Sequence, residues 1–257
     1  MTGRPDIPCR RLGGMPVAAL DRHALANRMS QDCAAARAGE NARPRLVFSA
    51  NGHALSLNAA DPDFTRLAGA ADILHADGQP LVIFSRLTPG LTIPERTATT
   101  DFFHDAAEIA LRDGLSFYFL GGAEEVLRRA IDAVKARYPD LKIAGARNGY
   151  FPAGRWREVA LEIAATRPDV VWVGLGRPYQ ERFSVAARDL LGGAGWIKTC
   201  GGLFGHLAGT EKRAPRWMQS LGLEWLYRLV QDPRGKARRY LVTNLHALWL
   251  LVTRSGR

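Results

Sequence analysis

Short apolar runs alternate with longer amphipathic stretches between residues 46 and 199, and this alternation restricts the fold more than any other feature of the sequence. Such an alternation is typical of parallel strands joined by crossover helices. The expected strands are residues 46–49, 72–75, 116–120, 142–146, 170–173 and 196–199. We therefore predict an α/β fold, a Rossmann-like, mostly parallel sheet flanked by helices.

Three stretches, one before the first expected strand and two between later ones, have clear helical character. Residues 22–37 are rich in alanine and follow Asp21, a favourable N-cap. In residues 124–138, Val126, Ala130 and Val134 recur on one face. Residues 156–166 repeat that pattern. These stretches are predicted to be the helices that cover the sheet.

The strand signals end at Gly209, and two basic helical segments follow at 214–230 and 236–253. Residues 232–235, Asp-Pro-Arg-Gly, are expected to separate them. The net charge is +10, and residues 213–257 hold nine Lys or Arg against two acidic residues, which is +7 of that total. We predict two parts, a catalytic α/β body at 1–209 and a C-terminal basic helical appendage at 210–257.

The sequence favours a cytoplasmic location. Three scattered cysteines have neither disulfide nor zinc spacing, and no apolar stretch of signal-peptide length follows the N-terminal arginines. The most apolar segment, 241–252, is shorter than the roughly 20 residues that span a bilayer.

Polar and glycine residues follow four of the expected strands. In an open parallel sheet, ligands bind beyond the carboxyl ends of the strands. The turns there are glycine-rich and lead into helices, which suits a nucleotide diphosphate; the alternative is that the glycines only make tight turns. The candidate ligand-binding residues at these ends are Ser49, Asn51, Gly121, Gly122, Gln180 and Glu181.

Asp77 is the candidate general base. It ends an expected strand and precedes Gly78, so a sugar hydroxyl could approach it closely. The alternative is that Asp77 caps a helix over residues 79–87.

A metal site and a nicotinamide cofactor are not expected. Asp61-Pro62-Asp63 resembles a metal-binding Asp-x-Asp motif, but Pro62 after Asp61 suits the start of a helix. His53, His104 and His206 lack ligand spacing, and no Gly-x-Gly-x-x-Gly motif is present.

Taken in order, the strand ends and the basic tail resemble the WecG/TagA/CpsF glycosyltransferases over about residues 46–241. The segments that carry the resemblance are Ser49-Ala50-Asn51, Ala76-Asp77-Gly78, Glu95-Arg96, Gly121-Gly122, Gly149-Tyr150-Phe151, Gly174-Leu175-Gly176, Gln180-Glu181, Ala208-Gly209-Thr210, Arg213-Ala214-Pro215, Glu224-Trp225 and Arg238-Arg239-Tyr240.

The resemblance implies an inverting, metal-independent transfer of a sugar from UDP to a polyprenyl-diphosphate-linked acceptor in cell-surface polysaccharide synthesis. The sugar would be N-acetylmannosamine, its uronic acid, glucose or another hexose. It also implies that Asp77 is the catalytic base and that Ser49 and Asn51 line its pocket. Arg96 and Gln180 would contact the donor or its diphosphate.

The resemblance further implies that the tail packs over the site and touches the inner face of the membrane. Arg228, Arg234, Arg238 and Arg239 are the candidate diphosphate ligands. Aromatic residues among these arginines suit an anionic membrane surface, although a solvated basic helix would have the same composition. A homo-oligomer is also compatible with the sequence.

The sequence departs from the family pattern at two positions, and one of them, Gly205, supports a rival interpretation, that of a catalytically weakened relative acting as a scaffold. Gly205 and Thr99 stand where the family has aspartate and glycine. A nucleic-acid-binding protein is disfavoured because the basic residues are confined to one end and no reading motif is present. A hydrolase is disfavoured because the sequence has no Gly-x-Ser-x-Gly elbow.

Overall fold

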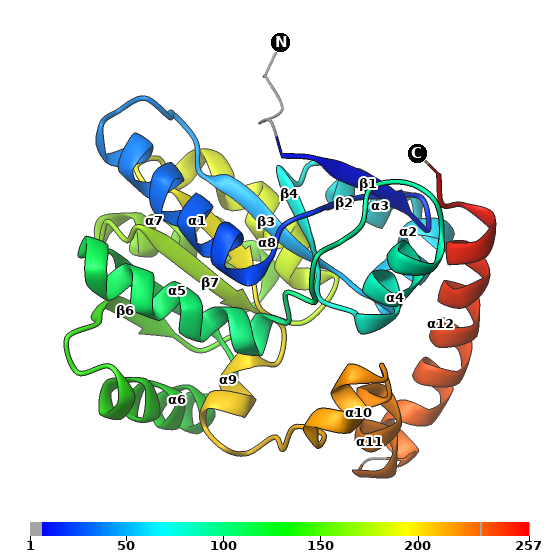
Figure 1. The fold of residues 1–257 in the computed structure, drawn as a ribbon. Coiled ribbons are helices and arrows are strands. Elements are labelled where there is room, and N and C mark those ends of the chain that lie inside the picture. The colour runs from blue at the N-terminus through cyan, green and yellow to red at the C-terminus, as the bar shows by residue number, and fades with distance from the viewer. Residues whose placement is uncertain (1–6, 232, 257) are drawn as a thin grey trace.

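The computed structural model describes residues 7–231 and 233–256, and of residues 228 and 233–241 the backbone alone (Figure 1). An eight-stranded sheet has the order β1-β2-β4-β3-β8-β7-β5-β6, and every pair except β1–β2 is parallel. The predicted mostly parallel α/β fold is confirmed. The strands are β1 Cys9–Leu12, β2 Met15–Ala18, β3 Arg45–Ala50, β4 Ile73–Ala76, β5 Ser116–Gly121, β6 Lys142–Arg147, β7 Val170–Gly174 and β8 Trp196–Thr199.

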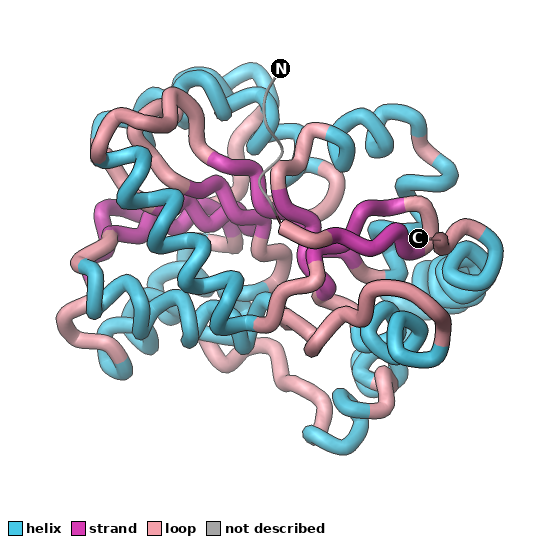
Figure 2. The backbone as a smooth tube through the Cα atoms, turned by 45° about the horizontal axis from the view of Figure 1, so that its top comes forward, coloured by secondary structure: helices cyan, strands magenta, loops and turns pink. Residues whose placement is uncertain are grey.

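Helices cover both faces of the sheet (Figure 2). One apolar core lies beneath α1, α5, α6 and α9, and the other beneath α2, α3, α4, α7, α8 and α12. The helices are α1 Arg22–Arg37, α2 Gly52–Ala60, α3 Pro62–Gly69, α4 Gln79–Leu87, α5 Thr99–Asp113, α6 Glu124–Arg137, α7 Trp156–Ala165, α8 Tyr179–Ala187, α9 Leu203–Leu207, α10 Arg216–Ser220, α11 Glu224–Gln231 and α12 Pro233–Thr253, with short 3-10 turns at Ala153–Arg155 and Arg188–Leu190.

The β1–β2 hairpin was not predicted. Gly13 and Gly14 both have positive φ angles, +55° and +89°, which is the conformation of a two-residue type I′ turn. The pair Gly13-Gly14 between two short segments with apolar residues could have indicated this turn in the sequence. The hairpin adds an antiparallel edge to the parallel sheet.

The C-terminal helices differ from the prediction in two places. The segment predicted as one helix over 214–230 is divided into α10 and α11, because Gly222 takes the left-handed conformation at φ +75°. The predicted break at 232–235 is wrong for Pro233, Arg234 and Gly235, which begin α12, since proline is favoured in the first turn of a helix. Residue 232 lies outside the described residues.

The C-terminal half of α12 packs against the body beside α2 (Figure 1). Ala247, Leu250 and Leu251 are buried in the same core as α2 and α4. Ser56 on α2 also bonds through Oγ to Nδ1 of His246, 2.9 Å away. This half of α12 is therefore part of the packed core, and the boundary at residue 209 stays a prediction.

Glycine backbones at the carboxyl ends of β5 and β7 pack in direct contact. A Cβ on Gly121 would lie 2.3 Å from the carbonyl oxygen of Gly174, and Gly121 has a φ of +138°. Gly122 follows at φ +71°. Only glycine allows both the conformation and the approach at residue 121.

We expect Gly121→Ala to lower the free energy of unfolding by about 3 kcal/mol or more, because a methyl group there collides with backbone that cannot move aside. Urea unfolding followed by tryptophan fluorescence measures the change. Gly176→Ala is the matched control, since Gly176 also has a positive φ, +76°, but open space around its Cβ position; its cost should be about 1 kcal/mol. Equal losses in the two variants would contradict the contact between β5 and β7.

Candidate active site

The carboxyl ends of the parallel strands meet at one edge of the sheet. The register pairs Ala50 with Ala76 at the ends of β3 and β4, and Gly121 with Gly174 at the ends of β5 and β7. The predicted site residues Asn51 and Asp77 therefore follow the adjacent strands β3 and β4, and Gly122 follows β5, three strands from β3 along the same edge. We call this edge the rim.

Asp77 is half-buried at the rim, directly after β4. Its Oδ1 accepts a hydrogen bond from the backbone N of Thr99 at 3.0 Å, and its Oδ2 accepts one from Nδ2 of Asn51 at 3.4 Å. The N-cap of α4 is Gly78, without a side-chain bond. The alternative that Asp77 caps α4 is therefore wrong, and the carboxylate instead holds the first N–H of α5.

Asn51 lies next to Asp77, and Ser49 lies two residues before Asn51 in β3, where the register pairs it with His75 of β4. Oδ1 of Asn51 caps α2 by accepting from Ala54 N, and it also accepts from Nη1 of Arg177 at 3.0 Å. Nη2 of Arg177 donates to the Ser49 carbonyl at 2.7 Å, and the Ser49 side chain is buried. Asn51 thus orients the carboxylate of Asp77 while being held by two neighbours.

Arg177 is a residue of the site that the sequence analysis missed. Its Nε donates to Oε1 of Glu181 at 2.9 Å, and it links β3 to α8 across the rim. The signal was present, since Arg177 and Glu181 stand four residues apart around the start of α8. The link that it makes to β3 depends on contacts with residues more than 120 positions away, which the local sequence does not reveal.

Gln180 and Glu181 are buried behind the rim. Gln180 donates through Nε2 to Oε1 of Glu181 at 3.0 Å and accepts from the backbone N of Gly201 at 3.0 Å. Glu181 is fully buried, and both Arg177 and Gln180 donate to its Oε1. These contacts tie α8 to the loop after β8.

Arg96 lies beside Asp77 but is engaged by protein groups. Its Nε donates to the Asp77 carbonyl at 2.8 Å, and its Nη2 lies 2.7 Å from Oε2 of Glu224 on α11. Arg96 therefore connects Asp77 to the C-terminal helices. The side chains of the other candidate diphosphate ligands, Arg228, Arg234, Arg238 and Arg239, lie outside the described part of the chain.

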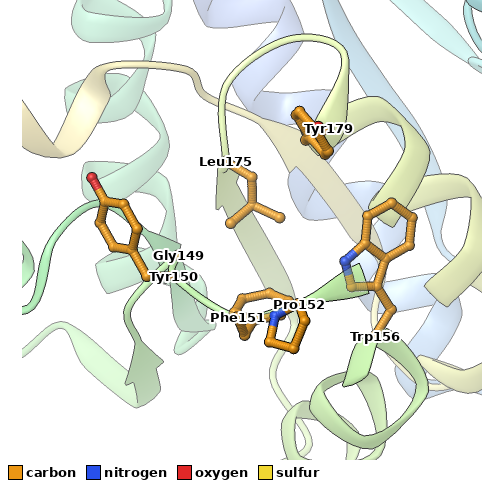
Figure 3. A pocket seen from close by; sticks show the side chains of 7 residues that line it. All are labelled: Gly149, Tyr150, Phe151, Pro152, Trp156, Leu175 and Tyr179. Atoms are coloured by element: carbon orange, nitrogen blue, oxygen red, sulfur yellow. The ribbon is translucent and has the colours of Figure 1, made fainter. Parts of the chain in front are cut away.

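An aromatic pocket of about 400 Å³ borders the glycine turn at the end of β5 (Figure 3). Gly149 at its edge donates through its backbone N to the Gly122 carbonyl at 2.9 Å. In Figure 3, Leu175 lies between Tyr150 and Trp156, and Tyr150 is 81% exposed. The lining residues are Gly149, Tyr150, Phe151, Pro152, Trp156, Leu175 and Tyr179. Gly149-Tyr150-Phe151 is one of the segments that carry the family resemblance, and the sequence predicted no function for it.

The carboxylate of Glu211 lies close to Gly205, one of the two departures from the family pattern. A Cβ on Gly205 would lie 3.1 Å from Oε1 of Glu211, and Oε2 of Glu211 is 3.5 Å from Nε2 of His206. The carboxylate of Glu211 thus lies beside the backbone of residue 205. The rim keeps an acidic group there although residue 205 has no side chain.

A buried cation lies behind the rim, in the middle of the sheet. Lys198 of β8 is fully buried; its Nζ donates to the Thr199 carbonyl at 2.5 Å and is 3.5 Å from Oγ1 of Thr99. Burial lowers the pKa of Lys198 to about 8, although the negative charge of Asp77 opposes the shift. Burial and the charge of Lys198 also hold the pKa of His75 well below its usual value.

The expected capping by Asp61 is confirmed. Asp61 is the N-cap of α3, its Oδ1 accepts from Asp63 N, and Pro62 occupies the first turn. Among the described side chains, no group of three His, Cys, Asp or Glu is placed to hold a metal ion. Likewise, within the described residues, no helix combines the length and apolar character that a membrane crossing needs.

The profile of the glycosyl transferase WecG/TagA/CpsF family matches residues 10–257. Two relatives carry the name N-acetylglucosaminyldiphosphoundecaprenol N-acetyl-beta-D-mannosaminyltransferase. The one from Bacillus subtilis (strain 168) is 34% identical over 208 residues, which are 81% of this chain and 76% of the relative. The one from Bacillus spizizenii (strain ATCC 23059 / NRRL B-14472 / W23) is 36% identical over 181 residues, 70% of this chain and 68% of the relative.

Lys198→Met should stabilise the protein at neutral pH. The pKa of Lys198 is about 8 in the fold against an ordinary 10.5, so between these values the unfolded chain binds more protons and wild-type stability rises with pH. Below pH 8 both states carry the charge, and its burial costs about 3 kcal/mol. Removing the charge should raise the free energy of unfolding at pH 7 by about 2 kcal/mol after some loss of packing and hydrogen bonding.

Urea unfolding at pH 7, 8, 9 and 10 measures this difference. The gap between Lys198→Met and wild type should close toward pH 10. Lys135→Met on the exposed face of α6 is the control, with a constant difference near zero. Parallel pH curves for Lys198→Met and wild type would show that the buried ammonium does not carry this cost.

Proposed function

This chain belongs to the WecG/TagA/CpsF family of glycosyltransferases, and we propose that it transfers N-acetylmannosamine from UDP to N-acetylglucosaminyl-diphospho-undecaprenol. The observation that carries the proposal is the carboxylate of Asp77, half-buried at the rim and aimed by Asn51 and Thr99. The choice of sugar and acceptor follows the names of the two relatives. The uronic acid derivative and glucose are the alternative donors for the same site.

In the proposed mechanism, Asp77 is the general base. It takes the proton of the acceptor hydroxyl while that oxygen forms a bond to the anomeric carbon of the donor sugar. The bond from this carbon to the UDP oxygen breaks, and UDP leaves with the electron pair. Attack from the side opposite to UDP inverts the anomeric configuration, so a single carboxylate is sufficient.

The leaving diphosphate needs positive partners, and we propose that the C-terminal helices supply them. Glu224 pairs with Arg96 beside Asp77, which places the start of α11 at the rim. Position 228 is one turn further along α11 from Glu224. Arg228, Arg234, Arg238 and Arg239 are proposed to hold the diphosphates by bidentate bonds, without a metal ion.

We propose that the aromatic pocket receives the nucleoside of the donor. The pocket adjoins the Gly121–Gly122 turn, where backbone can approach a diphosphate. The exposed ring of Tyr150 offers a stacking surface for the base, a contact of about 1–3 kcal/mol. Glu211 beside Gly205 supports an active enzyme over the scaffold alternative, since the rim retains an acidic group there.

Asp77→Asn should lower turnover by at least about 1000-fold, because it removes the base while its amide oxygen can still accept from the backbone N of Thr99; only the longer hydrogen bond from Asn51 is lost. The measurement is UDP release from UDP-N-acetylmannosamine in the presence of N-acetylglucosaminyl-diphospho-undecaprenol, compared with a panel of other UDP-sugars. EDTA should not change the wild-type rate. Wild-type turnover in Asp77→Asn would refute the assignment of the base, and loss of activity with EDTA would refute metal independence.

The outer face of α12 is proposed to lie on the cytoplasmic face of an anionic membrane. An apolar stripe of exposed side chains runs along it, opposite the residues buried against α2. Such a stripe on a helix next to basic segments suits an interfacial position. The stripe consists of Val242, Leu245, Leu248, Trp249 and Val252.

Leu245→Glu combined with Val252→Glu should reduce binding to phosphatidylglycerol vesicles at least about 10-fold, because two exposed apolar side chains that would enter the membrane are replaced by negative charges that the anionic surface repels. Co-sedimentation measures the bound fraction. Leu161→Glu, at an exposed apolar position on α7, is the matched control and should bind as wild type does. Unchanged sedimentation of the double variant would exclude α12 as the membrane contact.

A further inference from the structure

Lys198 is a charged residue that the proposed mechanism does not use. It has no exposed surface, so it cannot touch a substrate. Its neighbours in the register are Val47 on β3 and Trp172 on β7, both fully buried. An ammonium in such surroundings is costly unless nearby charges compensate it.

Lys198 is linked to Asp77 through one residue. Nζ of Lys198 lies 3.5 Å from Oγ1 of Thr99, and the backbone N of the same threonine donates to Oδ1 of Asp77 at 3.0 Å. Thr99 is the first residue of α5, so both contacts act on the start of one helix. Thr97, two residues earlier, donates through its backbone N to the Ala76 carbonyl at 2.8 Å. The 97–99 segment is thereby fixed between β4 and β8.

Five titratable or charged groups interact electrostatically with Lys198. They are the carboxylates of Asp77 and Glu181, the guanidinium of Arg177, the imidazole of His75 and the thiol of Cys200. Glu181 is already paired with Arg177. Asp77 makes no ion pair within the described residues, so it is the carboxylate whose charge is available to balance the buried ammonium.

We propose that Lys198 is a positioning residue for Asp77, its buried ammonium fixing Thr99 so that the start of α5 aims the carboxylate at the acceptor hydroxyl. This inference rests on the proposed role of Asp77 as the base. A general base must be held within hydrogen-bond reach of the proton that it removes, and a small displacement of the base lowers the rate strongly. Retention of a buried charge that costs stability is consistent with such a role.

The pH dependence of turnover separates positioning by charge from simple packing. Since the pKa of Lys198 is about 8, the ammonium is present at neutral pH and is lost above that value. Wild-type kcat should therefore fall as pH rises through about 8. In Lys198→Met, which never carries the charge, this decline should be absent.

The test measures kcat and KM for UDP-N-acetylmannosamine with the undecaprenyl-linked acceptor, from pH 6 to 9.5. Lys198→Met should lower kcat at pH 7 by roughly 10–100-fold, the usual size of effects exerted through a second residue, with KM changed less than about twofold. Thr99→Val, which removes Oγ1 but keeps the backbone N–H to Asp77, should lower kcat in the same direction. Lys135→Met should match wild type in kcat and in pH profile.

The outcomes separate this inference from the proposed function. Wild-type turnover in Asp77→Asn overturns the proposed function. An inactive Asp77→Asn together with wild-type kcat and an unchanged alkaline decline in Lys198→Met overturns the positioning role alone. If Lys198→Met fails to fold, Thr99→Val decides, and wild-type kcat in that variant overturns the inference.

Discussion

The hydrogen bonds between β3 and β4 set the position of Asn51 relative to Asp77. They hold Ala50 beside Ala76, and the Asp77 backbone N continues the pairing by donating to the Ala50 carbonyl at 2.9 Å. Asn51 therefore follows Ala50 at the same level at which Asp77 follows Ala76. A shift of one residue in this register would turn one of the two side chains to the opposite face. The geometry of the proposed base is thus a property of the sheet, and its precision comes from backbone pairing.

The C-terminal segment returns to this edge and is attached to the residues that surround it. Arg213 pairs with Asp101 near the start of α5, and Glu224 pairs with Arg96 beside Asp77. These two ion pairs are partly shielded from solvent, so they are screened less than surface pairs. The same helix start that holds the carboxylate of Asp77 therefore also lies next to the segment that carries the tail arginines.

The sequence predicted β3 to β8 to within about one residue, because most of these strands are largely apolar and end near glycine or polar residues. It also predicted that Asn51 and Asp77 would lie together. The sequence did not reveal two residues whose surroundings depend on distant parts of the chain. Arg177 links β3 to α8, and Lys198 is the single charged residue of the buried strand β8. The β1–β2 hairpin was not predicted because its two strands are only four residues long each. The apolar periodicity predicted one continuous helix where the structure has α10 and α11. The break occurs at Gly222, whose left-handed conformation leaves no mark in the apolar pattern.

The first hairpin of the chain is held by residues near its other end. The backbone N of Gly14 donates to the Arg254 carbonyl at 2.8 Å, and that of Gly13 donates to Oγ of Ser255 at 2.9 Å, across a separation of 242 residues. During synthesis, the hairpin emerges from the ribosome long before these partners exist. Contacts of such long range form late in folding, because the loop that they close must first be ordered. The β1–β2 hairpin is thus made before its partners and fixed only after them, and until then this edge of the sheet is open to pairing with other chains.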